Sequence, residues 1–125
     1  SLDALRLSPR ASQALVDISA HPLQNSAPPA ALAGYYEPSA VFLLGTQTRL
    51  VDGESAADYL AATPGAPIIV ADREHDAFLD RSAARDLSVV KRRAIEGYNY
   101  SKGDPVTLFV YTHSDSIPGA DGGAP

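Results

Sequence analysis

The sequence predicts an α/β fold: a three-layer, mostly parallel sheet of about five strands that ends in an antiparallel hairpin. Short apolar runs alternate along the chain with segments of helical periodicity, which is typical of βαβ units. Residues 68–70, Ile-Ile-Val, form a β-branched run between turn residues, as buried parallel strands do. Residues 106–112 are apolar on both faces of a strand, so helices should cover both sides of the sheet.

The length of 125 residues matches one domain, within which we expect three segments. Residues 1–29 should form an N-terminal helix and a linker, residues 30–115 the α/β domain, and residues 116–125 a disordered tail. The chain contains no methionine and begins with serine, from which we expect a processed protein or a fragment of a longer one.

The first helix is expected to begin at Ser8-Pro9, because serine is a good N-cap and proline suits the first helical position. Residues 21–29 are rich in proline, serine and asparagine, which predicts a linker. His21 and His113 lie near the ends of the ordered chain, where we expect exposed side chains. The apolar stripe of this helix consists of Ala11, Ala14, Leu15 and Ile18.

The remaining elements are delimited by turn residues, with proline at the start of one helix and glycine after its last residue. Asp72 is expected to cap the fourth helix, in which Phe78, Leu79 and Ala83 share one face. In the strand that follows, alternation should place Lys91 and Arg93 on one face and Arg92 on the other. The predicted elements are strands at 30–36, 49–51, 68–70, 87–98 and 106–112, helices at 38–44, 54–62 and after 72, and a hairpin turn at 101–104.

Composition excludes several function classes. The net charge of −5 repels phosphate backbones and anionic membranes, so nucleic acid and lipid headgroups are expected to be poor partners. The absence of cysteine rules out disulfides, zinc–thiolate sites and thiol catalysis. No phosphate loop, dinucleotide-binding glycine motif or nucleophile elbow is present.

The densest group of titratable residues is Asp72, Glu74, His75 and Asp76, just past the carboxyl end of a predicted strand. Ligands bind at that edge of α/β sheets. Acidic residues in a first helical turn are also favoured by the helix dipole alone, and we weigh that structural interpretation more heavily. The paired tyrosines at 35–36 and at 98 and 100 have two interpretations as well, since they could stack on a sugar or close the core.

Two stretches are more specific: residues 34–45, Gly-Tyr-Tyr-Glu-Pro-Ser-Ala-Val-Phe-Leu-Leu-Gly, and residues 97–103, Gly-Tyr-Asn-Tyr-Ser-Lys-Gly. Together they resemble the C-terminal soluble domain of bacterial membrane glycosyltransferases, the family of lipid-A aminoarabinose transferases and protein mannosyltransferases. The resemblance covers residues 30–112. It implies an accessory domain on the periplasmic side of the inner membrane, part of an integral membrane protein that transfers sugar from a polyprenyl phosphate donor.

In that family the transmembrane body holds the donor and the catalytic acid, and this sequence contains none of that body. The resemblance therefore implies no catalytic residue, metal or cofactor here. It implies the transmembrane body of the same polypeptide as partner, with the acceptor or the lipid-linked sugar as a possible ligand. The role implied is a cover over the reaction site or recognition of lipid A, protein or a similar acceptor.

The candidate binding residues lie in loops at the carboxyl ends of strands and at the hairpin tip. The competing interpretation is a free-standing α/β module that binds a small ligand or regulates, for instance a receiver-like domain, although the acidic pair after the first strand is missing. A small hydrolase lacks any nucleophile motif. The candidate residues are Tyr36, Glu37, Asp72, His75, Asn99, Tyr100 and Lys102.

Overall fold

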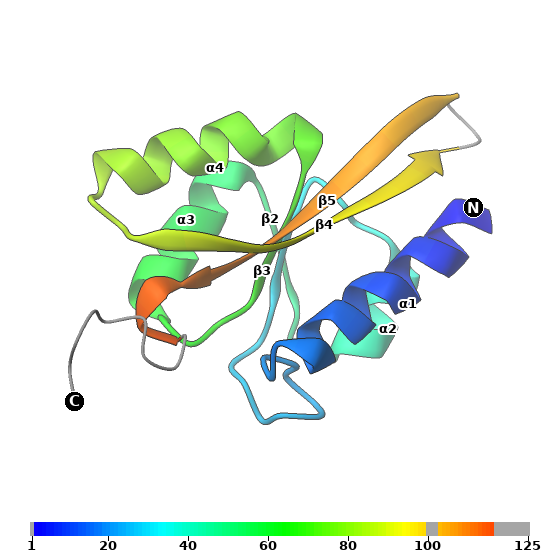
Figure 1. Cartoon of the computed structure of the whole chain (residues 1–125), viewed down its shortest axis with the longest axis horizontal. Helices are drawn as coiled ribbons and strands as arrows, with labels where there is room; N and C mark the ends of the chain where they lie inside the picture. Colours follow the sequence, from blue (N-terminus) through cyan, green and yellow to red (C-terminus); the bar gives the residue numbers. More distant parts are fainter. Residues whose placement is uncertain (1, 100–102, 117–125) are drawn as a thin grey trace.

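Helices and strands alternate along most of the chain (Figure 1). The computed structural model describes the backbone of residues 2–99 and 103–116 and the side chains of residues 6–98 and 103–116. The elements are α1 (Leu2–Asp17), β1 (Ala31–Ala33), α2 (Pro38–Leu44), β2 (Arg49–Val51), α3 (Gly53–Ala62), β3 (Ile68–Ala71), α4 (Asp72–Ala84), β4 (Val89–Asn99), β5 (Asp104–His113) and a 3-10 turn, η1 (Ser114–Ser116).

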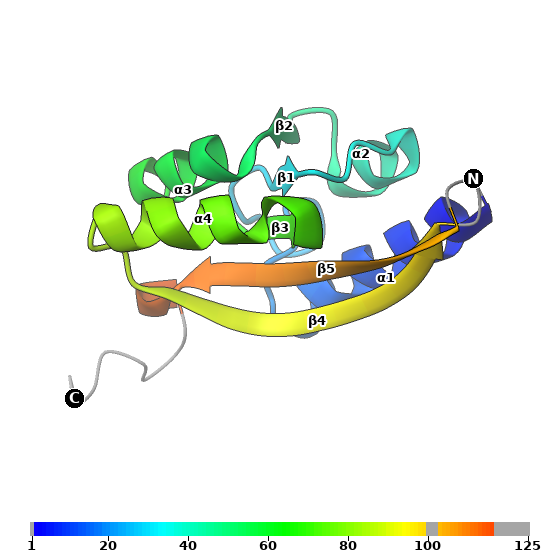
Figure 2. The ribbon, with the colours of Figure 1, turned by 90° about the horizontal axis from the view of Figure 1, so that it is seen from above.

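The five strands form one sheet in the order β2-β1-β3-β5-β4, with β2 and β4 at its two edges (Figure 2). β1 pairs in parallel with β2 and β3, whereas β5 is antiparallel to β3 and to β4. The predicted α/β class and the antiparallel hairpin are confirmed. The second strand of the hairpin, apolar on both faces, occupies the inner position, and the charged β4 takes the edge, where charges discourage further pairing.

Helices cover both faces of the sheet, as the apolar pattern of residues 106–112 predicts (Figure 1). Alternate residues of β3 and β5 point to opposite sides. Leu32, Ile69, Leu108 and Val110 form one core with α1 and α2, and Ile68, Val70, Phe78 and Tyr111 form the other with α3 and α4.

The first helix begins at Leu2, so the predicted start at Ser8-Pro9 is wrong, and Pro9 lies inside the helix. Leu7 is buried on the same stripe as Ala11, and this burial offsets the hydrogen bond that proline cannot make. Ser8 serves as a core contact instead of a cap. Its hydroxyl lies 2.8 Å from the Tyr35 hydroxyl and 2.8 Å from Ser39 Oγ.

His21 is 2% exposed, so the prediction of an exposed side chain is wrong; His113 is half-buried. The His21 ring organises the irregular segment after α1. Its Nδ1 accepts from the backbone N–H groups of Leu23 and Gln24, and its Nε2 lies 2.8 Å from Ser12 Oγ. Because Nδ1 accepts, the neutral ring fits this loop, and burial lowers the pKa of His21.

Four local predictions need correction. β1 ends at Ala33 because Gly34 adopts φ +81°. The N-cap of α4 is Ala71, so Asp72 is its first helical residue. A β-bulge between Lys91 and Arg93 breaks the alternation of β4, and these two side chains lie on opposite faces. On α4, Ser82 is buried where Ala83 was expected, since Ala83 is exposed.

Candidate functional site

The carboxyl ends of β1, β2 and β3 meet the first turn of α4, and two glycines allow this close approach. A Cβ at Gly53 would overlap the carbonyl oxygen of Glu74 and would lie 2.9 Å from the Phe78 nitrogen. At Gly34 a Cβ would lie 2.9 Å from Glu74 Cγ. The Glu74 carboxylate accepts a 2.6 Å hydrogen bond from the Gly53 N–H and so joins α4 to the start of α3.

Tyr36 and Arg73 form an exposed aromatic–cation pair at this edge. The Tyr36 hydroxyl donates a 2.6 Å hydrogen bond to the Val51 carbonyl, which fixes the ring at the end of β2. Arg73 Nε donates to the Gly34 carbonyl at 3.1 Å, and its guanidinium carbon lies 5.6 Å from the centre of the Tyr36 ring. Tyr36 is 45% exposed, so much of this large aromatic side chain faces solvent.

Two carboxylates lie next to this pair in the chain. Glu37 is the N-cap residue of α2, but its side chain makes no capping hydrogen bond and is half-buried. Asp72 is exposed, and its carboxylate accepts from the Arg73 N–H at 3.1 Å and from the Thr107 N–H at 3.3 Å. The second bond connects the start of α4 to the middle of β5, so the site extends across the sheet.

His75, one turn further along α4, lies against β5. Its ring stacks on Phe109 with 4.0 Å between ring centres, and its Nε2 lies 2.7 Å from the Tyr111 hydroxyl. Burial, and then the nearby charge of Lys91, lowers the pKa of His75, while burial raises the pKa of Tyr111. Both groups are therefore held in their neutral forms near pH 7. Lys91 Nζ lies 5.5 Å from the centre of the Phe109 ring.

The edge from Tyr36 to His75 presents a partly exposed aromatic ring, a guanidinium and the Asp72 carboxylate, which bond to the backbone of β2, of Gly34 after β1 and of β5. An aromatic face packs on apolar C–H surfaces, while guanidinium and carboxylate groups donate to and accept from hydroxyls. Among the side chains the structure describes, no group of three or more His, Asp or Glu could hold a metal ion. The arrangement is suited to binding a polyhydroxylated ligand.

Four of the predicted site residues, Tyr36, Glu37, Asp72 and His75, belong to this edge. Asn99 lies elsewhere: it pairs with Asp104 near the hairpin turn, three residues or roughly 10 Å along β5 from Thr107. Tyr100 and Lys102 lie outside the described residues.

Sequence reasoning missed Arg73 and the contacts of Tyr111 and Phe109. Arg73 carries a signal, since a cation in the first turn of a helix opposes the helix dipole and calls for another partner. The other two contacts have no local signal. They depend on β5 lying beside β3 and under α4, which is a property of the strand order.

Comparisons with known proteins find no counterpart: no family model, no curated protein and no solved structure matches this chain. None of the helices that the structure describes is both long and apolar enough to cross a membrane.

Proposed function

We propose that this chain is the extracytoplasmic accessory domain of a polytopic membrane glycosyltransferase, and that it binds a sugar-bearing substrate without carrying out the transfer itself. The parent enzyme would move sugar from a polyprenyl phosphate donor to lipid A, protein or a similar acceptor. The transmembrane body of the same polypeptide would be its partner, on the periplasmic side of the bacterial inner membrane.

One observation carries the proposal. Residues 34–45, one of the two stretches on which the resemblance to these transferases depends, also contribute to the exposed edge. Gly34 ends β1, Tyr36 presents its ring, Glu37 begins α2 and Gly45 ends it. One stretch of the resemblance thus supplies Tyr36 and Glu37 to the candidate binding surface, and α4 supplies the rest.

The chemistry of the edge supports a sugar as ligand. A pyranose has an apolar C–H face that can pack on Tyr36 and a rim of hydroxyls that can hydrogen-bond to groups such as the Arg73 guanidinium and the Glu37 and Asp72 carboxylates. Transfer from an activated donor also requires that water be kept away, and a rigid domain beside the site would contribute to this. Hydrogen bonds to the backbone fix the Tyr36 and Arg73 side chains at this edge.

The direct test is transfer activity of the parent enzyme. Tyr36→Ala is expected to lower kcat/KM about tenfold, which corresponds to loss of one aromatic contact of roughly 1.4 kcal/mol. Arg73→Gln should act in the same direction. Phe42→Ala is the matched control, because Phe42 is an aromatic residue of the adjoining helix that is 83% exposed and outside the edge. Equal activity of Tyr36→Ala and Phe42→Ala at normal expression would overturn the binding role.

Two further measurements separate the parts of the proposal. Titration of this chain with sugars or lipid A fragments should shift NMR signals around Tyr36 and Asp72, and no shifts would favour a purely structural cover. Reading the gene upstream of the Ser1 codon should reveal several runs of about 20 apolar residues. A start codon or a lone signal peptide there would leave the free-standing ligand-binding module.

A further inference from the structure

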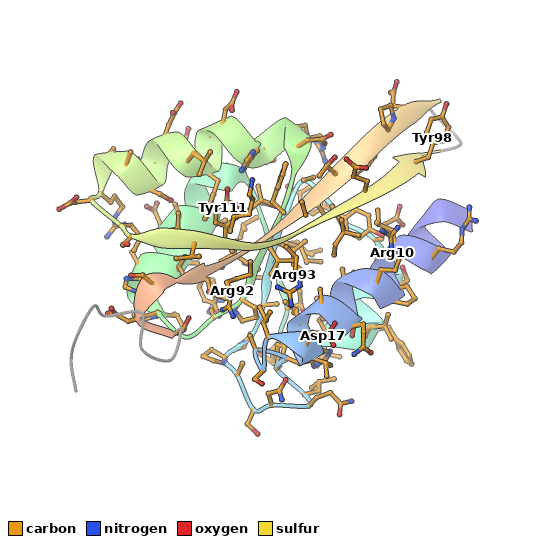
Figure 3. The ribbon with its side chains drawn as sticks, viewed as in Figure 1. Arg10, Asp17, Arg92, Arg93, Tyr98 and Tyr111 are labelled. Carbon is orange, nitrogen blue, oxygen red and sulfur yellow. The ribbon has the colours of Figure 1, made fainter. Side chains whose placement is uncertain are left out.

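Three arginines, Arg10 of α1 and Arg92 and Arg93 of β4, lie on the α1 side of the edge strand (Figure 3). We call them the arginine strip. Arg93 is paired with Val110, whose side chain belongs to the core under α1, and strand partners point to the same face. Arg92 reaches Thr112 Oγ1 at 3.1 Å, and Arg10 reaches the Glu96 carbonyl at 2.8 Å.

The strip differs from four arginines elsewhere in the structure in what it binds. Arg81 and Arg85 pair with the carboxylate of Asp58, and Arg49 and Arg73 lie over tyrosine rings. Within the described side chains, none of the three strip guanidinium groups lies within 4.0 Å of a carboxylate. Each bonds to a neutral oxygen, Arg93 to the Arg92 carbonyl at 2.7 Å, and a guanidinium has five donors in all.

The β-bulge explains why both β4 arginines reach this face. Regular alternation would place Arg92 and Arg93 on opposite faces of the sheet. The extra residue of the bulge allows both side chains to lie on the face that α1 covers. The acidic neighbours do not form ion pairs with them. By strand alternation from Ile95, Glu96 points to the opposite face, and the carboxylate of Asp17 on α1, which accepts from Gln13 Nε2 at 2.9 Å, has no guanidinium within 4.0 Å among the described side chains.

We propose that the arginine strip binds the phosphate groups of an anionic phospholipid bilayer, and so fixes how this domain lies against a membrane surface. The bonds of Arg10 and Arg93 to β4 are four residues apart, roughly 13 Å along the strand. One phosphate cannot contact both ends, whereas an array of phosphates can. Arg10 and Arg93 are exposed and Arg92 is half-buried, and β4 is an edge strand (Figure 2).

The net charge of −5 opposes this contact over the molecule as a whole, yet charges more than about 8 Å from the surface are largely screened at physiological salt. The strip is therefore a local exception to the expectation that lipid headgroups are poor partners. This inference does not depend on the proposed sugar site, because the two surfaces share no residue.

The test is co-sedimentation of this chain with vesicles of phosphatidylcholine alone and of equal parts phosphatidylcholine and phosphatidylglycerol. The chain should favour the anionic vesicles, less so as salt rises. The triple variant R10Q/R92Q/R93Q should lower its partition coefficient about fivefold per arginine, on the order of a hundredfold together. The matched control R49Q/R81Q/R85Q has the same net charge and should retain the preference.

Three results would overturn the proposal. The unaltered chain could partition equally into both kinds of vesicle, or the two triple variants could lose vesicle binding equally. The chain could also bind a single-stranded DNA as well as it binds the anionic vesicles. Circular dichroism checks that each variant is folded. If the strip variant does not fold, Arg93→Gln and the charge-preserving triple lysine variant replace it. The glutamine variant should then lower the partition coefficient about fivefold, and the lysine variant should leave it unchanged.

Discussion

Replacing Gly53 by alanine tests how tightly α3 and α4 approach each other beneath the candidate site. The added Cβ would overlap the Glu74 carbonyl oxygen and would lie 2.9 Å from the Phe78 nitrogen. Both are backbone atoms of α4, so no side-chain rotation relieves the contact and the helix must shift. Overpacking of this kind costs about 1–3 kcal/mol, and we take the upper end. The higher helix propensity of alanine offsets up to about 1 kcal/mol of this loss in the free energy of unfolding.

The expected net loss is therefore about 2 kcal/mol in the free energy of unfolding, or roughly 8 °C in Tm for a domain of this size. Urea unfolding followed by circular dichroism measures it. Gly65→Ala is the matched control, because its Cβ would lie 3.5 Å from Pro28 at a φ outside the left-handed region. That variant should be unchanged or about 0.4–1 kcal/mol more stable. If Gly53→Ala is as stable as Gly65→Ala, α3 and α4 do not approach each other as closely as the Gly53 contacts indicate.

Three further predictions address capping, burial and pH. Asp52→Ala should lower the free energy of unfolding by about 1 kcal/mol, because the Asp52 carboxylate caps α3. Glu37→Ala should lower it little, because the Glu37 side chain makes no capping bond. The urea midpoints of the two variants measure the difference. Phe78→Ala should cost about 3–5 kcal/mol and Phe42→Ala less than about 0.5 kcal/mol in thermal unfolding. Because the pKa of His21 is lowered in the folded state, the neutral ring contributes its full stability above pH 6.5, and this contribution is lost as the pH falls through the folded-state pKa. An NMR titration that gives His21 a pKa above 6.5 would contradict this.

Features set by neighbouring residues could be predicted from the sequence. The helix from Pro38 to Leu44 and the strand from Arg49 to Val51 have the predicted bounds, because proline, glycine and short apolar runs act locally. The start of α1 could not be predicted that way. A strong local signal at Ser8-Pro9 gives way to burial of Leu7 and to hydrogen bonds with residues about thirty positions away.

The candidate site divides in the same manner. The position of Tyr36, Glu37, Asp72 and His75 after the carboxyl ends of parallel strands could be predicted, because those ends meet at one edge whatever the strand order, and their role in binding stays a prediction. The contact of His75 with Tyr111 could not, since it requires β5 to lie between β3 and β4. Likewise, the β-bulge at Arg92 has no sequence signature of its own, and the arginine strip depends on it.

The two proposed surfaces make separate demands on the same molecule, and that separation decides what a failed experiment means. Tyr36 and Arg73 are anchored to the carbonyls of Val51 and Gly34, whereas the strip is anchored along β4. A strip variant that loses vesicle binding but keeps its NMR response to sugars assigns the two roles to two faces. If a folded strip variant loses both vesicle binding and the NMR response to sugars, sugar and phosphate would belong to one ligand that contacts both surfaces. Both proposals would then have to be redrawn as a single site for a phosphorylated glycolipid.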